Sequence, residues 1–135
     1  MKLSGSFKGT PFEKVFEGAA NLEAQGVETY YAMAQVAEEK GNEDMAKAFR
    51  ELARQEAVHS GYYATLAGLI PDDFWGYVDK MAEGEIQGQD QVMELSRKVK
   101  EAGFGDIARQ IELFAKQEGG HNVILNRLKT KYKPE

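Results

Sequence analysis

A pattern of glutamate and histidine residues occurs twice in the chain, with the same spacing each time. In each copy a glutamate is followed 33 residues later by a Glu-x-x-His motif, and the second copy begins 62 residues after the first. The first copy is Glu23, Glu56 and His59, and the second is Glu85, Glu118 and His121. These are the only 2 histidines of the chain. The repeat therefore predicts two equivalent halves that supply the same three side chains to one site.

Boundary signals divide the chain into four helices joined by tight turns. Thr10, Pro11 and Glu13 are typical of a helix start, because Thr can cap, Pro fits the first helical position and Glu completes a capping box. Gly41 and Gly103 predict helix ends, and Asn42 can cap the second helix. Pro71, Asp72 and Asp73 predict the end of the second helix and the start of the third. No segment has the pattern of a strand. The sequence thus predicts one all-α domain over residues 1–135, with helices at about 11–40, 43–68, 74–102 and 105–132.

Each predicted helix carries apolar residues at the 3.6-residue helical period. The repeated glutamates and histidines fall inside these stripes; Glu23, for example, lies between Ala19 and Val27. An unpaired buried carboxylate costs on the order of several kcal/mol. Ionisable groups at positions where the pattern predicts core therefore favour a bound cation.

A Glu and a His three positions apart lie on the same helix face. The Glu can then bridge two ions while the His binds one of them. The four carboxylates carry a formal charge that two divalent cations neutralise. Oxygen-rich ligands with two imidazoles suit iron or manganese, and zinc could bind there without redox chemistry. A single Glu-x-x-His is usually a surface coincidence, but two copies at identical spacing indicate a di-metal site.

Three further residues lie close to the predicted ligands. Tyr30 is two turns after Glu23 on the same face, and we treat it as a candidate catalytic residue that hydrogen-bonds a ligand carboxylate; core packing is the alternative. Gly26 and Gly88 each follow a ligand glutamate by one turn. They either allow close helix packing or leave space beside the metals for a small oxidant or a carboxylate movement.

Between residues 21 and 128 the chain resembles the rubrerythrin branch of the ferritin-like di-iron proteins. The resemblance rests on the stretches Asn21-Leu22-Glu23, Gln55-Glu56-Ala57-Val58-His59, Gly84-Glu85, Ala102-Gly103-Phe104-Gly105-Asp106-Ile107-Ala108 and Glu118-Gly119-Gly120-His121. It implies a ferritin-like four-helix bundle with two iron ions per site. It also implies roles for the six ligands: terminal for Glu23 and Glu85, bridging for Glu56 and Glu118, and binding one iron each for His59 and His121.

The same resemblance implies a non-haem di-iron oxidoreductase that reduces hydrogen peroxide, or dioxygen, to water. Two alternatives stay open, a ferroxidase or iron-handling protein and a metal-binding protein without turnover. Rubrerythrins usually carry a cysteine-rich rubredoxin domain, whereas this chain has no cysteine. We therefore expect a separate electron donor such as rubredoxin. Gly88 stands where the family has an additional glutamate that replaces a histidine on oxidation, so we expect His59 to stay bound in both states.

A ferritin-like bundle also constrains the assembly, because its second and third helices run parallel and need a long return connection. A return within one chain must climb ~36 Å at 1.5 Å per helical residue. The four residues 69–72 reach only ~14 Å when extended. The sequence therefore predicts a domain-swapped homodimer with two di-metal sites. The alternative is a simple up-down-up-down bundle.

Composition narrows the partners and the location. The net charge of −5 and the pI near 5.2 argue against nucleic acid as a partner. No apolar run approaches the length that spans a bilayer, and residues 1–10 lack the apolar stretch of a signal peptide. The absence of cysteine fits a reducing compartment. We expect a cytoplasmic protein that does not bind a membrane.

Overall fold

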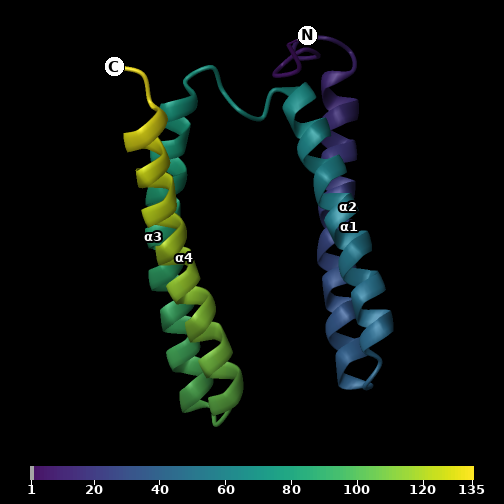
Figure 1. The fold of residues 1–135 in the computed structure, drawn as a ribbon, viewed down its shortest axis with the longest axis vertical. Helices are drawn as coiled ribbons and strands as arrows, with labels where there is room; N and C mark the ends of the chain where they lie inside the picture. The colour runs from purple at the N-terminus through teal and green to yellow at the C-terminus, as the bar shows by residue number, and fades with distance from the viewer. Residues whose placement is uncertain (1) are drawn as a thin grey trace. The chain divides into compact units, whose positions relative to one another are not determined.

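The computed structural model describes residues 2–135 and contains two helical hairpins (Figure 1). The helices are α1 (Glu13–Glu39), α2 (Glu43–Ala67), α3 (Phe74–Glu101) and α4 (Gly105–Tyr132). α1 packs against α2, and α3 packs against α4. One compact unit ends at Pro71 and the other begins at Asp72. The all-α prediction is confirmed, whereas the single domain over 1–135 stays a prediction.

Two local hydrogen bonds and one glycine explain three of the helix boundaries. Asn42 Oδ1 accepts from the Met45 backbone N–H at 3.0 Å and caps α2, as predicted. Asp73 Oδ1 accepts from the Gly76 N–H at 3.0 Å and caps α3. Gly41 has a φ of +74°, which lets the chain turn directly from α1 into α2. These boundaries were predictable because the capping groups lie within a few residues of the helix ends.

The start of α1 differs from the prediction. Thr10 Oγ1 donates to the Phe7 carbonyl at 2.6 Å and accepts from the Phe12 N–H at 3.2 Å. Thr10 thus stabilises a turn before the helix, and α1 begins at Glu13 with Phe12 as its N-cap. The cause is the preceding segment, whose Phe7 N–H donates to the Leu66 carbonyl at 3.1 Å near the end of α2. That long-range contact orients the turn, and no local pattern reveals it.

Alanine lines the contact within each hairpin. Ala46, Ala53 and Ala115 are 0% exposed, and across residues 2–135 no large side chain is fully buried. Small side chains let two helix backbones approach closely, but a pair of helices can bury only the strip where they meet. Many large residues of the predicted core stripes are therefore exposed within their own hairpin. They include Leu52, Met81, Ile107, Phe114 and Leu128.

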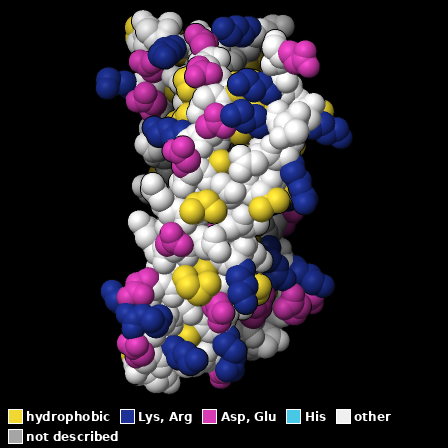
Figure 2. Space-filling view, turned by 90° about the vertical axis from the view of Figure 1, so that its left-hand side faces the viewer, with side chains coloured by type: hydrophobic (Ala, Val, Ile, Leu, Met, Phe, Trp, Pro, Cys, Tyr) yellow, Lys and Arg dark blue, Asp and Glu magenta, His cyan; other side chains and the backbone are white. Residues whose placement is uncertain are grey.

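Charged side chains of both signs cover the face shown in Figure 2, with hydrophobic side chains in separate patches between them. The negative net charge is thus dispersed on this face, and Lys and Arg do not form a continuous basic surface there. None of the helices within residues 2–135 combines the length and the hydropathy that crossing a membrane requires.

Candidate metal centre

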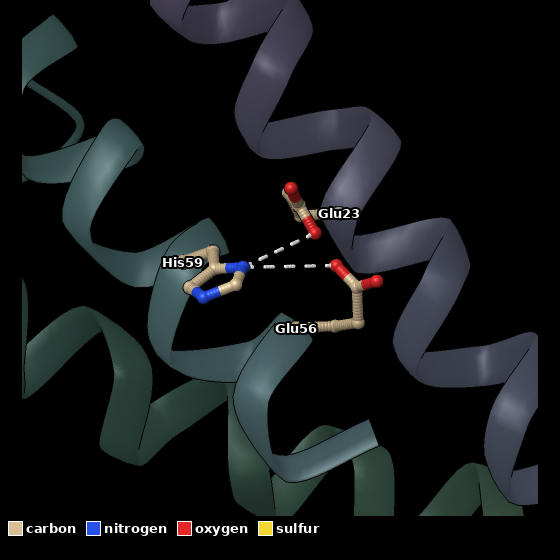
Figure 3. A group of neighbouring side chains, drawn as sticks. All are labelled: Glu23, Glu56 and His59. Atoms are coloured by element: carbon tan, nitrogen blue, oxygen red, sulfur yellow. Dashed lines mark ion pairs between the residues drawn. The ribbon is translucent and has the colours of Figure 1, made fainter. Parts of the chain in front are cut away.

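Glu23 of α1 and Glu56 and His59 of α2 converge at the middle of the first hairpin (Figure 3). Each offers a ligand atom, and these three atoms lie within 4.8 Å of one another. His59 Nδ1 is 3.7 Å from Glu23 Oε2 and 3.9 Å from Glu56 Oε2. The sequence spacing therefore produces one cluster of two carboxylates and one imidazole.

The second hairpin repeats this cluster with Glu85 from α3 and Glu118 and His121 from α4. The three ligand atoms again lie within 4.8 Å of one another. His121 Nδ1 is 3.4 Å from Glu85 Oε2. The structure thus brings the six predicted ligands together as two groups of three, one in each hairpin.

A hydrogen bond between the helices holds the register beside each group. Ser60 Oγ donates to the Ala20 carbonyl at 2.8 Å, and Asn122 Nδ2 donates to the Ala82 carbonyl at 2.7 Å. Ser60 and Asn122 each directly follow a histidine, and they are 62 residues apart. Both acceptor carbonyls lie one turn before a ligand glutamate. This pair was missed from the sequence, although the repeat itself was the signal that could have found it.

The carboxylates of the second group are electrostatically unsatisfied. The side chain of Glu85 is 19% exposed, and its buried Oε2 atom has no hydrogen-bond partner among residues 2–135. The pKa of the Glu118 carboxyl is raised, first because its protonated form hydrogen-bonds Glu85, and then because burial and the charge of Glu85 disfavour ionisation. His121 opposes this increase. Without a cation, the group thus favours a proton between its two carboxylates.

The separations between the ligand atoms in both groups are consistent with binding of a divalent cation. Two ligands at about 2.0–2.2 Å from one ion can lie up to ~4.3 Å apart. The measured separations of 3.4, 3.7 and 3.9 Å between histidine nitrogen and glutamate oxygen fall within this limit. A cation would also give the buried Oε2 of Glu85 a partner. Oxygen-rich sets with one imidazole suit iron, manganese or zinc.

Tyr30 contacts a neighbouring ring. It stacks on Phe49, with the ring centroids 6.4 Å apart and an interplanar angle of 17°. Within residues 2–135 the Tyr30 hydroxyl makes no hydrogen bond to a ligand carboxylate. The packing alternative describes the observed contact, and a catalytic role for Tyr30 stays a prediction.

The two groups differ in one pair of neighbours. A Cβ atom on Gly119 would lie 2.6 Å from Gln89 Oε1, so the Gln89 side chain rests on the α4 backbone next to Glu118. Val27 and Ala57 occupy the equivalent positions of the first half. Gly119 is part of a stretch that carries the family resemblance, but no sequence pattern predicts that Gln89 covers it.

Residues 14–70 match the family model described as rubrerythrin. An uncharacterized protein of Methanocaldococcus jannaschii is 27% identical over 128 residues, which cover 95% of this chain and 91% of the relative. No solved structure gives a significant match. Residues 14–70, which include the first Glu-Glu-His group, are therefore similar to the rubrerythrin family of ferritin-like di-iron proteins, and the chain has no cysteine for a rubredoxin site.

Proposed function

We propose that the protein is a non-haem di-iron oxidoreductase that reduces hydrogen peroxide, or dioxygen, to water. The observation that carries this proposal is the duplicated Glu-Glu-His cluster, in a chain whose residues 14–70 match the rubrerythrin family model. Two iron ions bound there would supply the two electrons that reduce one peroxide. The reaction consumes two protons and releases two waters.

The six side chains would divide the work of holding these ions. By the resemblance to rubrerythrins, Glu56 and Glu118 would bridge the ions, and Glu23 and Glu85 would be terminal ligands. His59 and His121 would each bind one ion. The four carboxylates would balance the two divalent charges. The ions would thus replace the proton that the hydrogen bond to Glu85, burial and the charge of Glu85 favour on Glu118, where they raise its pKa.

Each turnover with peroxide needs two electrons from outside the centre, and reduction of one dioxygen to water needs four. The chain has no cysteine, so it does not bind the iron of a rubredoxin site. We therefore propose a separate reductant, such as a rubredoxin, as the electron donor.

The centre also needs both hairpins, and we propose that they come from different chains. Leu22, Met33 and Val36 form an exposed apolar row on α1, 69%, 40% and 47% accessible. Met33 and Val36 also line a groove of about 490 Å³ that reaches Phe49 of α2. Exposed apolar surface of this kind is typical of an interface. A domain-swapped homodimer covers it with α3–α4 of the second chain and completes two centres.

Complementation tests the exchange directly. One variant carries Glu23→Gln and Glu56→Gln, and the other carries Glu85→Gln and Glu118→Gln. In each variant alone, every centre has one altered and one intact ligand group, whichever topology the chain adopts. In a swapped mixture the heterodimer holds one intact centre and one disabled centre, so metal binding returns to half of the wild-type level in the heterodimer. No recovery after co-refolding would contradict the exchange.

The function is tested by loading the protein anaerobically with two Fe(II) per centre. Stopped-flow spectra then compare oxidation by hydrogen peroxide and by dioxygen at equal concentration. Much faster reaction with peroxide supports the proposal, and the double variant Glu56→Gln/Glu118→Gln is the control for metal bound elsewhere. Equally slow oxidation by both oxidants contradicts turnover and leaves a metal-binding protein.

Ferroxidase or iron-handling activity is a second candidate, because Gly88 stands where the family has an additional glutamate. Faster oxidation by dioxygen, with uptake beyond two irons per centre, would favour this activity over peroxide reduction.

A further inference from the structure

Two glycines face the bridging glutamates. A Cβ atom on Gly26 of α1 would lie 3.3 Å from Glu56 Cδ, 3.4 Å from Cγ and 3.6 Å from Oε1. A Cβ atom on Gly88 of α3 would lie 3.6 Å from Glu118 Oε2. Because glycine has no side chain, each of these positions leaves space for the carboxylate of the facing helix.

Close packing of the helix backbones within a hairpin does not explain these glycines. The three heavy atoms nearest to the Cβ position of Gly26 all belong to the Glu56 side chain, and the Cβ position of Gly88 has one neighbour within 4 Å in the hairpin, Glu118 Oε2. Glycine is the least favourable residue in a helix interior after proline. It occurs at the same position in both halves, one turn after a ligand glutamate. The common neighbour of the two glycines is a ligand carboxylate.

We propose that Gly26 and Gly88 are positioning residues that allow Glu56 and Glu118 to adopt the conformation in which they bridge two metal ions. A bridging carboxylate must direct both oxygens toward ions while its stem crosses the facing helix. A methyl group at position 26 would displace the Glu56 side chain at the carboxyl carbon. The displacement would move the oxygens that bind metal while leaving the helix backbones in place.

The two halves should not respond equally. A contact of 3.3 Å at a Cβ atom requires the neighbour to move, whereas 3.6 Å is ordinary van der Waals contact. Alanine should therefore disturb the centre at position 26 and be tolerated at position 88. Valine at position 88 has two methyl groups more than alanine. It should displace the Glu118 carboxylate as alanine at position 26 displaces the Glu56 carboxylate.

Metal affinity and metal-free stability separate this role from a packing role. The variants are Gly26→Ala, Gly88→Ala and Gly88→Val. The matched controls are Gly61→Ala and Gly61→Val, because Gly61 is an exposed α2 glycine with nothing within 4 Å of its Cβ position. Anaerobic Co(II) titration, followed by the visible absorption bands, gives the affinity and stoichiometry. Thermal unfolding of the metal-free variants gives the stability.

We expect Gly26→Ala and Gly88→Val to lower Co(II) affinity at least tenfold, and Gly88→Ala and both controls to change it less than threefold. Metal-free melting temperatures should stay equal or rise. Unchanged affinity in Gly26→Ala overturns the proposal, as does a loss of metal-free stability that accompanies the loss of affinity. If Gly26→Ala does not fold, the comparison of Gly88→Val with Gly61→Val decides. The proposal rests on the proposed metal centre but not on its reaction, and Co(II) binding by the unmodified protein tests that centre separately.

Discussion

Lengthening the connection between α2 and α3 should convert the proposed dimer into a monomer. Eleven residues separate Glu56 from Ala67, and eleven separate Phe74 from Glu85. At 1.5 Å per helical residue, a return between parallel helices must climb ~33 Å. The seven peptide steps from Ala67 to Phe74 span at most ~25 Å. The shortfall of ~8 Å is the reason that two intact helices cannot complete the parallel arrangement within one chain.

Insertion of twelve Gly and Ser residues after Leu69 removes this shortfall. The connection then extends to more than ~60 Å, and its relaxed end-to-end distance is ~23 Å. The mass measured by light scattering on a sizing column should fall from about twice the chain mass, which is 15.1 kDa for the unmodified chain, to a single chain mass at low protein concentration. The Co(II) stoichiometry should stay at two ions per chain. The same insertion at Gly41, in the α1–α2 turn, should leave the dimer intact.

Two results would refute this reasoning. If the unmodified protein is a monomer that binds two metal ions tightly, the helices form an up-down-up-down bundle within one chain. If the inserted protein stays a dimer at every concentration, the short connection is not the cause of dimer formation.

Further predictions concern the hairpins and the metal. Because the pKa of Glu118 is raised in the folded state, protonated Glu118 stabilises the metal-free fold fully below pH 4.5. This contribution to the free energy of unfolding is lost as the pH rises through the raised pKa. Glu118→Gln should therefore reduce the fall in the free energy of unfolding that urea melts measure over this pH range. Ala53→Leu should lower the free energy of unfolding by about 1–3 kcal/mol because Ala53 is 0% exposed, whereas the exposed Ala24→Leu should change it by less than ~0.5 kcal/mol. Asn122→Ala should lower it by about 1 kcal/mol through loss of the hydrogen bond to the Ala82 carbonyl. Removal of metal by a chelator should lower the melting temperature of the loaded protein.

Each of these predictions has a contrary result. An unchanged pH profile in Glu118→Gln would show that another group causes the fall. Equal effects of Ala53→Leu and Ala24→Leu would contradict the tight alanine contact. Unaltered stability of Asn122→Ala would mean that solvent replaces its hydrogen bond, and a melting temperature insensitive to the chelator would contradict metal binding by the folded state.

The sequence predicted features that depend on neighbours along the chain. Asn42 and Asp73 cap their helices as expected, since both contacts span three residues. The two ligand groups followed from the repeat, because helical periodicity sets the face of each residue. Thr10 was placed wrongly because its turn depends on a contact between the N-terminal segment and α2. Gln89 was missed because its position on Gly119 depends on the distance between two helices.

Each ligand group lies within one hairpin, which has a consequence for the order of folding. The first group spans residues 23–59 and the second spans residues 85–121, so each forms from contacts that are local in sequence. Helical hairpins with such local contacts fold fast, in microseconds to milliseconds. A chain emerging during synthesis can therefore form its first Glu-Glu-His group before the second group is complete. In the proposed di-metal centre, metal can then bind the first group, and pairing with the second group becomes the last step of assembly.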